Sequence, residues 1–200
     1  MGKLFVIMGK SATGKDSLYR KLVKKQPELI EIVSYTTRPI REGENEGKEY
    51  HFVTEQQMLE LKEQGKIAEC RKYYTVRGPW YYFTADDGQI DFESGANYIL
   101  ISTLEGYEKL RDFYGKENIV PIYIEVEDFV RLERAMKRER QQKSPCAAEL
   151  CRRFVADEED FSEERLQAAE ITNRIENDDL EQALEQIEKL IRNESKVGLE

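Results

Sequence analysis

The residues from Gly9 to Ser17, Gly-Lys-Ser-Ala-Thr-Gly-Lys-Asp-Ser, have the types and spacing that bind a polyphosphate. Small residues let successive backbone N–H groups turn inward around an anion, and the Lys15 side chain can reach its outer phosphates. The motif follows an apolar run and precedes a helical pattern, which is the context of a phosphate-binding loop. It predicts a polyphosphate site made of Gly9, Ser11, Ala12, Thr13, Gly14, Lys15, Asp16 and Ser17.

Asp16 departs from this motif, because the position after the lysine normally carries a Ser or Thr whose hydroxyl binds Mg²⁺. A carboxylate is also a hard oxygen ligand that suits Mg²⁺, although it adds negative charge beside the phosphates. Ser17 or a water molecule is the alternative ligand. The sequence therefore predicts an altered Mg²⁺ site at Asp16.

A second candidate site lies between Ser34 and Val53, in a turn-rich segment that contains Arg38, Arg41 and Tyr50. The guanidinium group of arginine presents a planar fork of donors that matches phosphate oxygens, and a tyrosine hydroxyl can donate to the same group. This combination favours an anionic ligand. On composition alone, a solvated loop with incidental charges is the alternative.

The elements that position these residues follow from the apolar pattern. The continuous run from Lys3 to Met8 is typical of a central parallel strand that is buried on both faces. Apolar positions at helical spacing follow until Pro27. Further along the chain we expect strands at 30–33, 98–101 and 119–126, and helices at 104–114 and 128–142. This alternation predicts an α/β fold with a parallel sheet flanked by helices.

Residues 34–84 interrupt the alternation, because they are polar, charged and aromatic. We interpret them as an insertion that forms its own lobe, on a single domain of residues 1–200 whose core is 1–33 and 95–200. Within the insertion we expect a helix at 55–64 and strands at 67–74 and 80–83.

Residues 131–153 carry a dense set of arginines, interrupted by Lys143-Ser-Pro145, which breaks the helical pattern and can act as a hinge. We interpret this segment as a lid. A last apolar piece at 170–175 precedes Asp178, which is expected to cap a C-terminal amphipathic helix.

The second segment resembles the guanylate kinase family, whose pattern S-x-T-T-R-x-x-R-x-G-E-x-x-G-x-x-Y-x-F it matches from Ser34 to Phe52. The resemblance extends through most of the chain and weakens between about Cys70 and Ser94. It implies a P-loop NTPase-type core, a monophosphate-binding lobe formed by the insertion, and transfer of the γ-phosphate of ATP to GMP with Mg²⁺ as cofactor.

The resemblance also implies which residues bind the acceptor. It would place the acceptor phosphate on Arg38, Arg41, Tyr50 and Tyr82, and guanine on Ser34, Glu69, Thr84 and Thr103. The Glu69 carboxylate can accept hydrogen bonds from the ring N–H and amino group that guanine has and adenine lacks. Thr103 stands where the family has an Asp, and a hydroxyl lacks the charge assistance worth roughly 1.5–3 kcal/mol. We therefore expect a weaker preference for guanine.

The family's lid arginines match Arg138 and Arg153 best, which with Lys15 would form the catalytic group. Phosphoryl transfer needs positive charge around the migrating group, which such residues supply. A solvated helix face paired with the acidic run from Asp157 to Asp160 is the alternative for some arginines. Asn177 matches a family position near the adenine of ATP. The neighbouring candidates for the lid are Arg134, Arg140 and Arg152.

Composition limits the remaining partners. A net charge of −9 argues against general affinity for a nucleic-acid backbone. The apolar run from Leu4 to Met8 is too short for a signal peptide or a membrane span, so we expect a cytoplasmic protein without a membrane partner. The three cysteines show no metal-ligand spacing and are expected to be free thiols.

The resemblance thus predicts ATP and GMP as small-molecule partners, in purine nucleotide metabolism, and makes no prediction of oligomeric state. One alternative keeps the reaction but changes the acceptor to another monophosphate, which Thr103 and the divergent residues 70–77 support. The other alternative is a non-catalytic module that binds phosphorylated protein segments. Retention of Gly14, Lys15 and the lid arginines argues against it.

Overall fold

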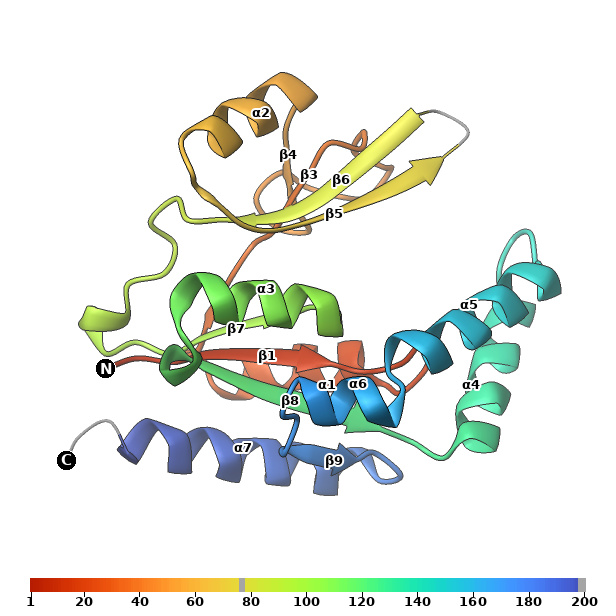
Figure 1. The fold of residues 1–200 in the computed structure, drawn as a ribbon. Helices are drawn as coiled ribbons and strands as arrows, with labels where there is room; N and C mark the ends of the chain where they lie inside the picture. Colours follow the sequence, from red (N-terminus) through yellow and green to blue (C-terminus); the bar gives the residue numbers. More distant parts are fainter. Residues whose placement is uncertain (76–77, 198–200) are drawn as a thin grey trace.

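A five-stranded parallel sheet forms the centre of the molecule (Figure 1). The computed structural model describes residues 1–75 and 78–197. The strands of the central sheet are β2 (Ile30–Glu31), β7 (Tyr98–Ile101), β1 (Leu4–Met8), β8 (Ile119–Glu125) and β9 (Arg174–Glu176), in that spatial order. The sheet places the carboxyl end of β1, where the Gly-rich loop begins, between two neighbouring strands.

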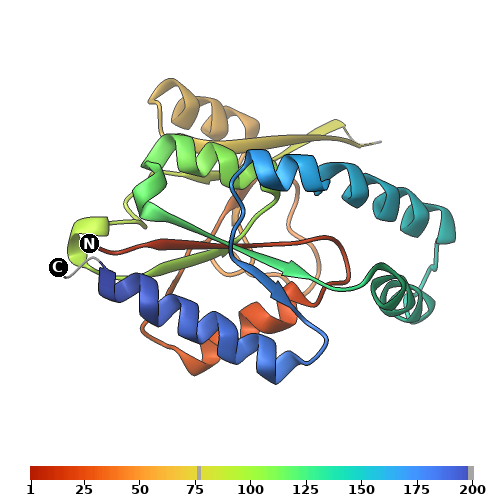
Figure 2. The ribbon, with the colours of Figure 1, turned by 60° about the horizontal axis from the view of Figure 1, so that its bottom comes forward.

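The middle strand β1 is buried on both faces, and its side chains alternate between two apolar cores. Leu4, Val6 and Met8 belong to the core under α3 (Leu104–Tyr114) and α6 (Glu163–Ala168). Phe5 and Ile7 belong to the core under α1 (Lys15–Lys25) and α7 (Leu180–Val197). Figure 2 shows the red α1 (Lys15–Lys25) and the blue α7 (Leu180–Val197) on one face of the sheet. The helices on both faces fix the position of β1.

Residues 35–85 build a second sheet, which lies beyond α3 in Figure 1. Its strands run in the spatial order β4 (His51–Phe52), β3 (Tyr35–Thr36), β6 (Gly78–Ala85) and β5 (Ile67–Thr75). The helix α2 (Glu55–Glu63) covers it and starts with a capping box between Thr54 and Gln57. Met58, Phe83 and Ala85 form the small buried core of this part.

The two chain segments that join this sheet to the central one are bonded to each other at a single side chain. The amide oxygen of Gln89 accepts the Val33 N–H at 3.0 Å, and the amide nitrogen donates to the Val33 carbonyl at 3.3 Å. The Gln89 amide thus makes the two hydrogen bonds with Val33 that the backbone of a neighbouring strand would make. The chain therefore leaves the central part of the fold and returns to it at one place.

A helical hairpin extends from the end of β8. Its helices are α4 (Asp128–Arg140) and α5 (Ala147–Asp160), and Lys143-Ser-Pro145 lies in the turn between them. Two short 3₁₀ turns complete the fold, η1 (Phe92–Ser94) and η2 (Lys116–Asn118). No helix within the described ranges is long and apolar enough to cross a membrane.

Most predicted elements are confirmed, with differences at some of their ends. The strand at 98–101 and the helix at 104–114 have the predicted bounds, whereas β2 is shorter than predicted and β6 is longer. The two-residue strands β3 and β4 and the helix α6 were not predicted. Asp179 rather than Asp178 caps α7, because its carboxylate accepts the backbone N–H groups of the first turn at 2.9 Å.

A core substitution in α7 tests the packing of this last helix. Ile187 is fully buried among side chains of β1, β8 and α1. We expect Ile187→Ala to lower the free energy of unfolding by about 2–5 kcal/mol, measured by urea denaturation. The control is Gln186→Ala at the exposed neighbouring position, which should change stability by less than about 0.5 kcal/mol. Equal effects of the two substitutions would contradict this packing.

Candidate functional site

The loop between β1 and α1 has the backbone that the phosphate-binding motif predicts. Ala12 and Gly14 have positive φ angles of 66° and 85°. A Cβ atom added at Gly9 would lie 2.4 Å from the Ile124 carbonyl oxygen, and one at Gly14 would lie 2.5 Å from the Asn177 side-chain nitrogen. Glycine is therefore required at both positions, because the loop packs directly on its neighbours.

Side chains from later parts of the chain anchor this loop. The Asn177 side chain is buried, and its amide nitrogen donates to the Thr13 carbonyl at 2.7 Å. The Thr13 hydroxyl donates to the Lys10 carbonyl at 2.9 Å. An Asp157 carboxylate oxygen accepts the Ser11 N–H at 2.8 Å. Asn177 thus holds the loop, and its amide nitrogen is already engaged there.

Lys15 starts α1 at the edge of a pocket, and its ammonium lies 3.5 Å from the Lys10 carbonyl oxygen. Burial lowers the pKa of Lys15; the carboxylates of Asp16 and Asp157 oppose this shift, and the guanidinium of Arg138 adds to it. A partly buried cation beside a phosphate-binding loop favours an anionic partner.

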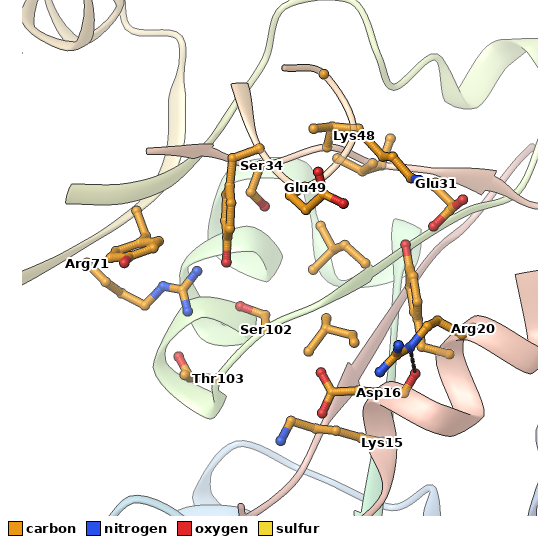
Figure 3. A pocket seen from close by; sticks show the side chains of 18 of the residues that line it. Lys15, Asp16, Arg20, Glu31, Ser34, Lys48, Glu49, Arg71, Ser102 and Thr103 are labelled. Carbon is orange, nitrogen blue, oxygen red and sulfur yellow. Dashed lines mark hydrogen bonds between the residues drawn. The ribbon is translucent and has the colours of Figure 1, made fainter. Parts of the chain in front are cut away.

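A pocket of about 880 Å³ joins the phosphate-binding loop to the second sheet. Figure 3 shows Lys15 and Asp16 of α1 at one end and the Ser102–Thr103 segment, which follows β7, along the wall. Six of the residues predicted to bind nucleotides line it: Lys15, Asp16, Ser34, Tyr50, Tyr82 and Thr103. The Ser17 side chain is exposed in the first turn of α1 and is not part of the lining.

Arg38 lies beside this pocket and is held by a carboxylate. Its two terminal nitrogens donate to the Glu44 carboxylate at 2.7 and 2.6 Å, and its guanidinium lies 5.2 Å from the Tyr50 ring centre. The hydrogen bond from Arg38 is the main cause that lowers the pKa of Glu44 to about 2. Arg41 is exposed, and its backbone N–H donates to the same carboxylate at 2.8 Å. Glu44 therefore organises both arginine positions.

Glu69 and Thr84 lie on neighbouring strands and are buried. The Arg71 Nε and Nη2 atoms donate to the two oxygens of Glu69 at 3.0 and 3.1 Å. The Thr84 hydroxyl donates to Glu69 at 3.1 Å and lies 3.5 Å from the Ser34 hydroxyl. The structure thus brings Ser34, Glu69 and Thr84 together, but only Ser34 lines the pocket.

Thr103 lines the pocket and also caps α3. Its hydroxyl oxygen accepts the Gly106 N–H at 3.1 Å. This interaction is the role that a threonine at a helix N-terminus ordinarily has. The oxygen is therefore partly committed to the helix, while the hydroxyl hydrogen can still face a ligand.

The arginines of the helical hairpin have different surroundings. Arg138 is exposed on α4, whereas Arg153 on α5 pairs with Glu139 across the hairpin at 3.3 Å. The alternatives Arg134 and Arg152 are also engaged, with the Asn177 carbonyl at 3.1 Å and with Glu149 at 2.7 Å. None of these arginines lines the pocket.

Arg131, at the start of the same segment, is 1% exposed and is part of an ion-pair network with Asp128, Asp157 and Glu158. Its guanidinium also stacks on the Phe154 ring at 3.9 Å. Arg131 therefore pairs with the acidic run, as the alternative for some arginines expects, but it does so in a buried network rather than on a solvated helix face.

Sequence reasoning missed Arg71 and Ser102, which both line the pocket. A signal for Arg71 was present, because it lies two residues after Glu69 and alternate residues of a strand share one face. The signal was weak because the family resemblance fades after Cys70. Burial is the largest single influence on the pKa of Arg71 and lowers it. The charge and the hydrogen bond of Glu69, with smaller effects of Tyr73 and Tyr50, together raise this pKa above its ordinary value, so Arg71 stays a cation.

Asp16 is the pocket carboxylate next to Lys15 and suits a divalent cation; Glu31 and Glu49 also line the pocket. Its carboxylate lines the pocket beside Lys15, and Mg²⁺ is usually held by one or two carboxylates together with substrate phosphates. Over residues 1–75 and 78–197, no group of three or more acidic, histidine or cysteine side chains forms a preassembled metal site. The site thus suits a cation that arrives with a phosphate ligand.

A central parallel strand that ends in a Gly-rich loop and a helix is the arrangement of P-loop nucleotide-binding proteins. The sequence model of the guanylate kinase family matches residues 1–194. The chain is 33% identical to the guanylate kinase of Nostoc sp., over 94% of this chain and 88% of that protein. It is 29% identical to the guanylate kinase of Thermotoga maritima, over 96% and 87%.

The crystal structure of guanylate kinase from Anaplasma phagocytophilum has a similar fold. The TM-score is 0.66 at 22% sequence identity, with 97% of this chain and 86% of that chain covered. The family match and the structural match both cover nearly all of the chain. The chain therefore belongs to the guanylate kinase family of phosphotransferases.

Replacing Asn177 tests how the loop is anchored. We expect Asn177→Ala to lower the free energy of unfolding by about 1–3 kcal/mol, because the buried Thr13 carbonyl loses its donor. Urea denaturation measures this change. The control is Asn193→Ala at an exposed position of α7. An effect no larger than that of the control would contradict the anchoring role.

Proposed function

We propose that this chain transfers the γ-phosphate of ATP to GMP and forms ADP and GDP. The observation that carries the proposal is the single pocket that joins Lys15 of the phosphate-binding loop to Ser34, Tyr50 and Tyr82 of the second sheet. A direct transfer requires the donor and acceptor phosphates to meet in one cavity, shielded from water. Membership of the guanylate kinase family supports the same reaction.

On the donor side, the loop residues 9–17 bind the phosphates of ATP through backbone N–H groups, and Lys15 contacts the outer phosphates. Asp16 holds Mg²⁺, which would neutralise charge on the phosphates during transfer. The Ser11 N–H is bonded to Asp157 and would have to exchange this carboxylate for a phosphate. Asn177 holds the loop through the Thr13 carbonyl, and we assign it to the adenine side of the ATP site.

On the acceptor side, we assign the phosphate of GMP to Arg38, Arg41, Tyr50 and Tyr82. The Nε atom of Arg38 is buried and has no hydrogen-bond partner among the described residues. Such a donor needs an acceptor, which a phosphate oxygen would supply. We assign the base to the end of the pocket near Ser34, Thr103 and the pair of Glu69 and Thr84.

Arg138 and Arg153 are assigned to a lid formed by residues 131–153, which would close over the phosphates together with the lobe of residues 34–84. An exposed Arg138 that already affects the pKa of Lys15 supports this assignment. No general base is needed, because the acceptor oxygen of a monophosphate is already anionic. We assign the activity to purine nucleotide metabolism in the cytoplasm, where both substrates occur.

A different monophosphate is the second candidate acceptor, because Thr103 replaces an expected carboxylate and its oxygen caps α3. A coupled assay of ADP formation with GMP, dGMP, AMP, UMP and dTMP separates the two candidates. GMP should give the highest kcat/KM. A higher value for another monophosphate would reject the acceptor and keep the reaction, and no transfer to any of them would reject the reaction.

The role of Lys15 is tested by Lys15→Ala. We expect kcat to fall about 100-fold or more, because the variant loses a cation that stabilises charge on the transferring phosphoryl group. The control is Lys24→Ala on the exposed side of the same helix, which should retain activity. Normal turnover of a folded Lys15→Ala protein would rule out the phosphate-binding assignment.

The acceptor phosphate site is tested by Arg38→Ala and Arg41→Ala. Each substitution should weaken GMP binding roughly 10- to 100-fold, because a charge-assisted hydrogen bond is lost. ATP affinity should stay unchanged. Titration calorimetry measures both, with Arg192→Ala on the exposed side of α7 as the control. Unchanged GMP affinity in both variants would show that the acceptor phosphate binds elsewhere.

A further inference from the structure

The Arg71 side chain occupies the wall of the pocket at the end assigned to the base. It comes from β5 and extends toward Ser102 and Thr103, the two residues that follow β7 (Figure 3). Arg71 has 16% of its side chain exposed, compared with 1% for Glu69. A ligand in this pocket therefore meets the guanidinium of Arg71 before it meets the carboxylate of Glu69.

Glu69 fixes the orientation of that guanidinium. It binds one side of the group, Nε and Nη2, and leaves the end formed by Nη1 and Nη2. A guanidinium group has five N–H donors, and this end presents two of them in parallel. Across the described part of the chain, no acceptor other than Glu69 is hydrogen-bonded to Arg71. The free end is a preoriented fork.

The acceptors near this fork are largely used. The Oε1 atom of Glu69 accepts hydrogen bonds from both Arg71 and Thr84 and has no acceptor position left. The Oε2 atom accepts only from Arg71 and keeps one acceptor position. Glu69 in this arrangement cannot bind both the ring N–H and the amino group of guanine. The donors of Arg71 therefore determine which base edge fits.

We propose that Arg71 reads the base, and that its Nη1–Nη2 end binds the O6 and N7 atoms of a 6-oxopurine monophosphate. This proposal rests on the proposed function, since it concerns the acceptor of that same site. Paired donors of arginine match the two adjacent acceptors O6 and N7 of guanine. Adenine has an amino group in place of O6, which would face these donors with a donor of its own.

The proposal has a consequence for the range of acceptors. The purine of IMP has the same O6 and N7 atoms as that of GMP and lacks only the 2-amino group. Arg71 does not contact position 2, so it selects both nucleotides over AMP equally. IMP is therefore an acceptor of this chain alongside GMP.

Ser102 supports a ligand at this place. Ser102 lines the pocket, and its hydroxyl is buried and has no hydrogen-bond partner within the described residues. A Cβ atom at Gly106 would lie 2.2 Å from this oxygen, so the hydroxyl is closely enclosed on the side of α3. Buried hydroxyls are normally bonded, and rotation of the Ser102 side chain toward the pocket would let a base supply the missing partner.

The test measures kcat/KM for GMP, IMP and AMP with the wild type and with Arg71→Met. We expect the values for GMP and IMP to fall together by roughly 10- to 100-fold, and the value for AMP to stay the same or rise. The control is Lys72→Met, which removes a cation from the adjacent exposed position of β5 and should change none of the three values. A fall for GMP alone would overturn the proposal, because Arg71 would then act only through Glu69.

Arg71→Met leaves the Glu69 carboxylate buried without its cation, so a second variant is needed if it fails to fold. Arg71→Lys keeps the positive charge but loses the paired donors. We expect it to lower kcat/KM for GMP and IMP in parallel, by a smaller factor than Arg71→Met. Unchanged preference for GMP over AMP in a folded Arg71→Lys protein would overturn the proposal.

Calorimetric binding of GMP, IMP and AMP to the same proteins separates this inference from the proposed function. If the wild type binds GMP and IMP but transfers no phosphate, the proposed reaction fails while Arg71 is still tested by affinity. If the wild type transfers phosphate to GMP and neither substitution of Arg71 alters binding of GMP or IMP, only the role of Arg71 fails. If GMP and IMP do not bind, both fail.

Discussion

The complete burial of β1 is the constraint on which the site depends. Its five side chains are divided between two cores, so the strand can neither tilt nor slide without disturbing both. The loop that follows the carboxyl end of β1 is consequently held in one position, packed against Ile124 of β8 and Asn177 beyond β9. A loop of small residues has little stiffness of its own, and here the surrounding core and a buried amide provide it.

Carboxylates organise the cations around the pocket, which explains how an acidic chain can bind two polyanions. Glu44 holds Arg38 and Glu69 holds Arg71, each through two hydrogen bonds. In each pair the carboxylate fixes one side of the guanidinium and leaves other N–H groups for a ligand. The positive charge is therefore local and oriented, although the net charge of the chain is −9.

The central sheet could be predicted because its signals are local in the sequence. The apolar run at β1 and the helical spacing after residue 104 reflect burial on a continuous face, and both elements occur where predicted. The strands β3 and β4 have two residues each and exist only through pairing with partners far along the chain. Such pairing leaves no periodic signal to detect.

The same distinction applies to the site. The phosphate-binding loop is one contiguous motif, so its residues and the turn that they form could be predicted together. The contact of Asp157 with Ser11 and the pairing of Arg71 with Glu69 depend on which elements become neighbours and in which register. A motif from the family also could not show that Thr103 is engaged as a helix cap.

The amide of Gln89 has a consequence for how this fold can change in evolution. The Gln89 amide bonds the two connecting segments to each other at Val33. With respect to the core, residues 34–88 are therefore a loop whose ends are held together. The entropy of loop closure grows only slowly with length, so residues can be added or removed inside this segment at little cost to the core. The extended hairpin of β5 and β6 lies in this tolerant region. Acceptor specificity can therefore diverge in evolution while the loop of residues 9–17, which is assigned to the triphosphate, stays the same.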